Sequence, residues 1–151
     1  MKQDIAPNFH GDTQHGISIL AVAAMKESSE IERILSHTRW QSHVVHSIHD
    51  AKQVLRSLPI SVVLCDNRLP DGTWLDVMRE TEQDGRRPEV IVLSASADLA
   101  LWNEVHNRGG YTLLATPLQA REVYALVQAT TGPGYYAAAE SITKRKIAKA
   151  S

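Results

Sequence analysis

The sequence predicts an α/β fold: an open, doubly wound sheet of parallel strands with helices on both faces. Short apolar runs alternate along the chain with stretches of helical periodicity. Several of these runs are continuously apolar, which is typical of strands that are covered on both faces. Strands that alternate with helices of this length require right-handed crossovers within one sheet. The length of 151 residues suits one domain with some additional residues at its ends.

The strands are expected where the apolar runs lie, at Ile17–Val22, His43–Val45, Ile60–Cys65, Val90–Leu93 and Thr112–Leu114. The first run resembles the core of a signal peptide, but the residues before it are polar and include Asp4 and Asp12. A signal peptide begins with a short positive segment, and a membrane span needs about 20 apolar residues. The run therefore predicts a buried strand, and we expect no membrane association.

The helices are expected between the strands, at Ser28–His37, Asp50–Leu58, Trp74–Thr81, Asp98–Arg108 and Leu118–Thr130. Asp50 is the expected N-cap of the second helix, and Pro59 marks its end. Gly109-Gly110 stops the fourth helix and Gly132-Pro133-Gly134 the fifth. The predicted domain therefore spans residues 16–131, between a flexible leader at 1–15 and a tail with a basic end at 132–151.

Composition excludes several classes of function. Sixteen basic and 17 acidic residues give a net charge of -1, so no strong field attracts nucleic acid or anionic lipid. The basic end of the tail, at Lys144, Arg145, Lys146 and Lys149, lacks aromatic neighbours and is more typical of a solvated terminus than of a nucleic-acid site. The single cysteine, Cys65, cannot form an internal disulfide, and its place in a strand predicts an inert core thiol. A cytoplasmic location is expected.

The carboxyl edge of such a sheet holds the working site, near the switch point in strand order. Ala23, Ala24, Asp66, Ser94 and Thr116 each lie just beyond a predicted strand. Asp66 is the most informative, because it directly follows a wholly apolar run. Its position alone leaves two interpretations open, a functional carboxylate or a residue that caps a loop.

Three segments resemble the receiver domains of response regulators in two-component signalling. They are Val62–Met78 (VVLCDNRLPDGTWLDVM), Ile91–Ser96 (IVLSAS) and Gly109–Leu118 (GGYTLLATPL), and their order and spacing match the family. The resemblance implies a flavodoxin-like, five-stranded parallel sheet and a role as a phosphorelay component or partner module. It places Asp66 on the phosphorylated aspartate. Candidates for phosphoryl contact are Ser94, Thr116 and Asn67, and Leu113 falls on the aromatic switch position.

The departures from the family pattern bear on mechanism. Ala23 and Ala24 stand where the family has the acidic pair that holds Mg²⁺, Thr116 replaces its lysine, and Trp74 replaces a glycine. The metal and the lysine neutralise the transferred phosphoryl group, and losing one such group commonly costs about 3 kcal/mol in the transition state. One carboxylate is a poor site for Mg²⁺. We therefore expect no cofactor and lost or very weak Mg²⁺ binding.

Three charged residues after the first strand are candidates to substitute for the missing groups. Lys26, Glu27 and Glu30 follow the first strand and are near enough in sequence to enter the site. A metal site at His43, His46 and His49 is not expected, because residues of a strand at this spacing point to opposite faces.

The favoured function is a regulatory module that acts through protein–protein contacts, with weak or no phosphorylation of Asp66 and no enzymatic activity. The alternative in the same family is a working phosphoacceptor that a histidine kinase phosphorylates on Asp66. A more distant alternative is a flavodoxin-like binder of a small cofactor. The expected partner is a histidine kinase or another signalling protein.

An interaction face is predicted on the fourth and fifth helices. Periodicity turns Ala120, Val123 and Val127 inward and leaves Tyr124 and Leu126 towards the flanks or the outer surface of the helix. Together with Trp102 and Tyr111, Tyr124 would form an exposed aromatic patch that supports a homodimer or a target contact. The alternative is that Trp102 packs over its own helix.

Overall fold

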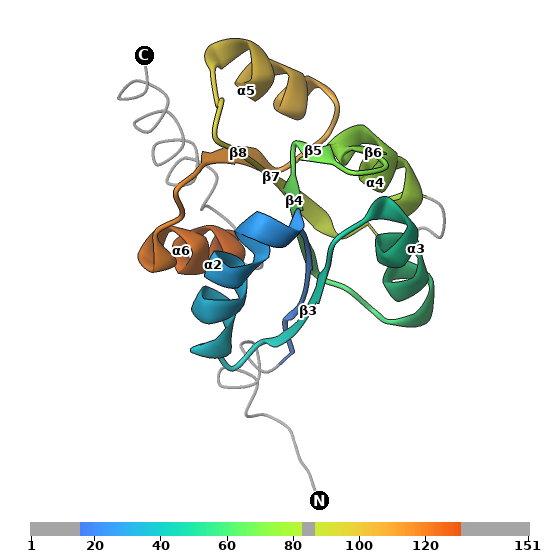
Figure 1. Cartoon of the computed structure of the whole chain (residues 1–151), viewed down its shortest axis with the longest axis vertical. Helices are drawn as coiled ribbons and strands as arrows, with labels where there is room; N and C mark the ends of the chain where they lie inside the picture. The colour runs from blue at the N-terminus through green and yellow to red at the C-terminus, as the bar shows by residue number, and fades with distance from the viewer. Residues whose placement is uncertain (1–15, 83–86, 131–151) are drawn as a thin grey trace, which may run out of the picture.

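The computed structural model describes residues 16–82 and 87–130, and it confirms the predicted α/β class (Figure 1). A five-stranded, wholly parallel sheet has the order β3-β2-β4-β7-β8. Its strands are β2 (Ser18–Val22), β3 (Gln41–Val45), β4 (Val62–Asp66), β7 (Glu89–Ser94) and β8 (Thr112–Ala115). The predicted leader, tail and final helix stop lie outside the described residues.

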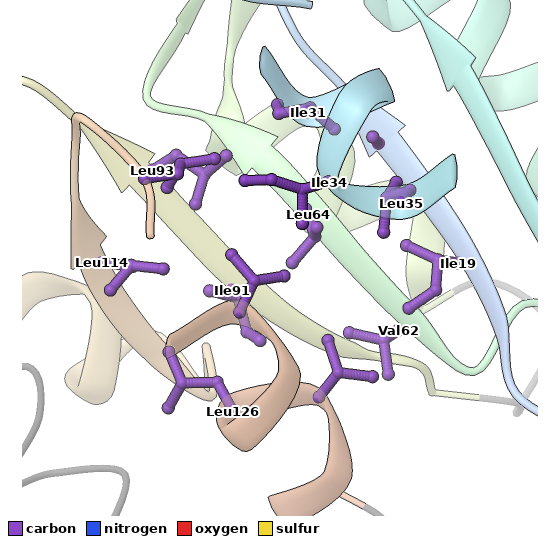
Figure 2. Packing of buried hydrophobic residues seen from close by; sticks show 14 of the residues in the cluster. Ile19, Ile31, Ile34, Leu35, Val62, Leu64, Ile91, Leu93, Leu114 and Leu126 are labelled. Atoms are coloured by element: carbon purple, nitrogen blue, oxygen red, sulfur yellow. The ribbon is translucent and has the colours of Figure 1, made fainter. Parts of the chain in front are cut away.

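Helices cover both faces of this sheet (Figure 1). One face carries α2 (Met25–Ser36) and α6 (Ala120–Ala129), and the other carries α3 (Ile48–Ser57), α4 (Trp74–Thr81) and α5 (Leu99–Asn107). Alternate residues of each strand enter the two layers: Val62 and Leu64 join the α2/α6 cluster, and Val63 and Cys65 join the other. Figure 2 shows the first cluster, in which helix residues such as Ile34 and Leu126 meet the strand side chains.

Several boundaries differ from those that the sequence predicts. Helix α2 begins at Met25 rather than Ser28, because the connection from β2 consists of Ala23 and Ala24 alone. Helix α3 is capped by Ser47, whose hydroxyl accepts the N–H of Asp50 at 3.1 Å, so the prediction of Asp50 as N-cap was wrong. Among the residues described, no helix is both long and apolar enough to span a membrane.

The loop after β4 contains a small antiparallel hairpin that the sequence analysis did not predict. Its strands are β5 (Arg68–Leu69) and β6 (Gly72–Thr73). At its tip, the carboxylate of Asp71 accepts the N–H groups of Ile48 at 2.8 Å and His49 at 3.0 Å. These bonds satisfy free donors of the first turn of α3, and they lower the pKa of Asp71. The hairpin is therefore fastened to α3.

Replacing Asp71 with alanine removes both acceptors. We expect Asp71→Ala to lower the free energy of unfolding by about 1 kcal/mol in urea denaturation at neutral pH. Because the folded state depresses the pKa of Asp71, its contribution is present above the ordinary value of 3.8 and is lost as the pH falls below it. Glu32→Ala, which removes an exposed carboxylate from α2, is the control; an equal loss in both variants would contradict the assignment.

Candidate functional site

Asp66 ends β4 at the carboxyl edge of the sheet, between β2 and β7. The residue is 8% exposed, and its Oδ2 atom accepts the N–H of Ala24 at 2.9 Å. The backbone around it is fixed, because the N–H of Asn67 is bonded to the carbonyl of Leu93 at 2.8 Å. Asp66 therefore presents a largely buried carboxylate in a defined place.

The carboxylate borders a pocket of about 250 Å³ that opens to solvent. Its lining consists of Glu27, Asp66, Asn67, Arg68, Leu93, Ser94, Ala95, Ser96 and Thr116. The structure thus brings together the residues predicted as phosphoacceptor and phosphoryl contacts. Within the pocket, the buried hydroxyl of Ser94 accepts the N–H of Ser96 at 3.1 Å and so closes the turn after β7. The roles of these residues in phosphoryl transfer stay predictions.

Glu27 is the substitute group that reaches the site. It lies in the first turn of α2 and lines the pocket beside Asp66, because that helix begins earlier than predicted. Glu30 lies elsewhere, since its Oε1 atom accepts the N–H of Leu118 at 3.3 Å. The side chain of Lys26 is outside the described part. The short connection between β2 and α2 is the sequence signal that could have singled out Glu27.

The electrostatics of the pocket disfavour charge on Asp66. Burial raises the pKa of Asp66 to about 6. The hydrogen bond from Ala24 opposes that rise, while Glu27 adds to it through its negative charge and a side-chain hydrogen bond. No ion pair to Asp66 is found among the side chains that the structure describes, and the exposed Arg68 on the rim forms none with it.

The positions that depart from the family pattern lie in different surroundings. Ala23 is fully buried in the α2/α6 cluster, whereas Ala24 is partly exposed beside Asp66. Trp74 is 2% exposed and packs in the opposite cluster, so it does not fill the pocket. Leu113 is likewise buried there, and its predicted switch role stays a prediction.

The histidines and the cysteine near the site have structural contacts. His46 donates a hydrogen bond from Nδ1 to the carbonyl of Ala23 at 3.1 Å, and His49 lies 3.5 Å from the amide of Gln53. In residues 16–82 and 87–130, no group of at least three His, Cys, Asp or Glu side chains could hold a metal ion.

Cys65 is buried, and burial raises the pKa of its thiol, in keeping with the predicted inert core residue.

The predicted aromatic patch is not formed. Tyr111 is 3% exposed, and Tyr124 packs edge-on against Trp40, with ring centroids 5.8 Å apart, on the α2/α6 face. Trp102 packs against the opposite cluster and lies over His106 of its own helix, at 4.1 Å between ring centroids. Leu126 is buried rather than outward-facing. Because Tyr111 is buried and Trp102 and Tyr124 pack on different faces of the sheet, the three side chains do not form one exposed patch.

The raised pKa of Asp66 and the influence of Glu27 on it can be tested by titration. We expect the carboxyl carbon of Asp66 to titrate with a midpoint near pH 6 in ¹³C NMR, and Glu27→Gln to lower that midpoint because it removes the neighbouring charge. Glu32→Gln, on the exposed side of α2, should leave it unchanged. A midpoint near the ordinary value of 3.8 would contradict the described burial.

Stability should follow the same titration. The pKa of Asp66 in the folded state exceeds its unfolded value of 3.8. Asp66 therefore does not lower the free energy of unfolding in acid, where it is protonated in both states, and lowers it fully above about pH 6. We expect Asp66→Asn to stabilise the chain more at pH 8 than at pH 4, by about 1–2 kcal/mol after allowance for screening by water in the pocket. Urea denaturation at both pH values measures the difference, and an equal effect would contradict it.

Comparison with known proteins identifies the family. A family model described as the response regulator receiver domain matches residues 19–128. The probable transcriptional regulatory protein y4xI of Sinorhizobium fredii is 29% identical over 86 residues, which cover 57% of this chain and 38% of that protein. The response regulator protein PilR of Pseudomonas aeruginosa is 24% identical over 97 residues, which cover 64% of this chain and 22% of PilR. The chain spans well under half the length of these curated relatives.

Solved receiver domains have the same fold. The receiver domain of the sensor histidine kinase PA1611 from Pseudomonas aeruginosa, with a magnesium ion in its active-site cleft, aligns with a TM-score of 0.65 and 24% identity over 74% of this chain and 94% of that chain. A response regulator from Burkholderia pseudomallei with a phosphorylated aspartic acid and calcium aligns with a TM-score of 0.69 and 14% identity over 83% of this chain and 71% of that one. The chain belongs to the response regulator receiver domain family of two-component signalling.

Proposed function

We propose that this receiver domain is a regulatory module that acts through contacts with other signalling proteins, with weak or no phosphorylation of Asp66. The observation that carries the proposal is the hydrogen bond from the Ala24 N–H to Asp66 Oδ2. The uncharged N–H of Ala24 is thus bonded to one carboxylate oxygen of Asp66, and the methyl side chain of Ala24 supplies no carboxylate to hold a metal ion. Thr116, at the far side of the pocket, carries a hydroxyl and no positive charge.

The residues present do not fit a magnesium ion. Mg²⁺ demands near-ideal octahedral geometry with oxygen ligands, and it is held by carboxylates. Glu27 and Asp66 are the carboxylates that line the pocket, and one oxygen of Asp66 is already engaged. Burial, with a smaller contribution from Glu27, raises the pKa of Asp66 and so disfavours the ionised form that a metal would need. We derive no step through a metal and propose that Mg²⁺ binds very weakly.

The working phosphoacceptor is the second candidate. It is favoured by the convergence of Asp66, Asn67, Ser94 and Thr116 on one pocket. Phosphorylation would then depend on a kinase that supplies the missing charge itself. The flavodoxin-like cofactor binder has less support, because the pocket of about 250 Å³ is smaller than the roughly 300–1,000 Å³ of typical cofactor sites.

Membership of the family supports proposals for the partner and the location. We propose a histidine kinase or another signalling protein as partner, no enzymatic turnover, and a cytoplasmic location. Homodimerisation through α5 and α6 stays a prediction that no longer rests on an aromatic patch.

Incubation with a small phosphodonor and Mg²⁺ tests the phosphorylation state. We expect no stoichiometric gain of about 80 Da in intact-mass spectrometry, because each missing charged group lowers the rate by roughly 10²–10³. The double variant Ala24→Asp/Thr116→Lys restores a carboxylate and an ammonium and should gain label. Stoichiometric labelling of the unaltered chain that Asp66→Asn abolishes would establish the working phosphoacceptor instead.

Substitution of Ala23 and of Ala24 by aspartate should have different effects on Mg²⁺ binding and on stability. We expect a flat calorimetric titration with Mg²⁺ through millimolar concentrations, and a response in Ala24→Asp, since Ala24 is partly exposed beside Asp66. Ala23→Asp should instead destabilise the fold by about 3 kcal/mol, because its carboxylate would enter the apolar α2/α6 cluster. Saturable Mg²⁺ binding by the unaltered chain would show that Glu27 and Asp66 suffice.

A further inference from the structure

The pocket holds two carboxylates that no described side chain neutralises. Asp66 is nine-tenths buried, and the hydrogen bond described for its carboxylate, from Ala24, reaches Oδ2. Glu27 lies beside it, and both line the same solvent-open cavity. A buried carboxylate is costly unless it is paired with a cation. Among the described side chains, no cation is paired with it.

The remaining lining suits a cation that carries hydrogen-bond donors. The hydroxyls of Ser94 and Thr116 and the side-chain oxygen of Asn67 are acceptors around the same cavity. An ammonium has three N–H donors and a guanidinium has five, so either could satisfy several acceptors at once. The volume of about 250 Å³ admits the end of such a side chain.

Two exposed apolar residues that lie near pocket residues along the chain favour a protein as the source of the cation. Met25 is 70% exposed at the start of α2, next to Ala24, and Leu99 is 60% exposed at the start of α5, after the Ser94–Ser96 turn. Exposed apolar residues two and three positions along the chain from the lining residues Glu27 and Ser96 match a basic side chain that has apolar neighbours. A free amine would leave Met25 and Leu99 in water.

We propose that the Glu27–Asp66 pocket receives the ammonium or guanidinium group of a lysine or arginine side chain from a partner protein. The inference rests on the proposed function, since a phosphoryl group on Asp66 would occupy the same space. The partner's cation neutralises Asp66 and Glu27, and its flanking apolar residues contact Met25 and Leu99.

Titration of the full chain with capped Leu-Lys-Leu tripeptide tests the charge recognition. The reporter is the amide resonance of Ala24, whose N–H is bonded to Asp66. We expect a saturable shift that weakens as the pH falls through about 6, where Asp66 takes up a proton. Tetramethylammonium chloride has the same charge but no N–H donor, and it should give no such shift.

Matched variants locate the contact. Asp66→Asn should abolish the saturable shift, and Glu27→Gln should weaken binding about tenfold, whereas Glu32→Gln on the exposed face of α2 should leave it unchanged. Thr116→Lys provides a second measurement, because its ammonium should compete for the pocket and raise the melting temperature only when Asp66 is present. Equal binding by Asp66→Asn, or a shift with tetramethylammonium, would overturn the proposal.

The source of the cation is tested with butylammonium, which mimics the end of a lysine side chain. The tripeptide should bind on the order of tenfold more tightly than butylammonium, and Met25→Ser should reduce that advantage. Equal affinities would overturn the assignment to a partner protein, as would displacement of the tripeptide by millimolar Mg²⁺. Stoichiometric phosphorylation would refute the proposed function, whereas a flat tripeptide titration without phosphorylation would refute this inference alone.

Discussion

The burial of β4 on both faces is the constraint on which the site depends. Val62–Cys65 are at most 1% exposed, between β2 and β7 and beneath helices on either side. Such a strand has no place for a charged side chain until it leaves the two apolar layers, and Asp66 is the first residue to do so. Because both clusters fix the strand, the carboxylate is held at the edge even though no described cation is paired with it.

The charge on Asp66 is governed by a balance between one hydrogen bond and desolvation. A hydrogen bond to a charged group contributes about 1.5–3 kcal/mol, whereas withdrawing a carboxylate from water costs several kcal/mol. The N–H of Ala24 therefore offsets only part of the cost, and Glu27 increases it. The pKa of about 6 shows that desolvation prevails. A pocket in this state favours neutralisation, by a proton or by a cation from outside.

Patterns along the chain predicted the features that depend on local order, and contacts between distant residues explain the misses. Asp66 and its pocket neighbours followed from strand ends, because parallel strands bring their carboxyl ends to one edge. Glu27 was not distinguished from Lys26 and Glu30, because its place in the pocket depends on a helix that starts directly after Ala24, earlier than the periodicity predicted. Tyr111 and Leu126 lie in the core because the α2/α6 layer covers them, and periodicity within one segment does not reveal its neighbours.

The site is tied into the framework at many points, which preorganises it for recognition. The N–H of Thr116 is bonded to the carbonyl of Ser94, and Asn67 is bonded to Leu93, so backbone contacts join the pocket loops to neighbouring strands. Asp71 fastens the following hairpin to α3. A rigid, preorganised surface loses little conformational entropy when it binds, and that raises affinity. A cation that binds in the pocket would therefore neutralise the carboxylate of Asp66 without a conformational change at the carboxyl edge of the sheet.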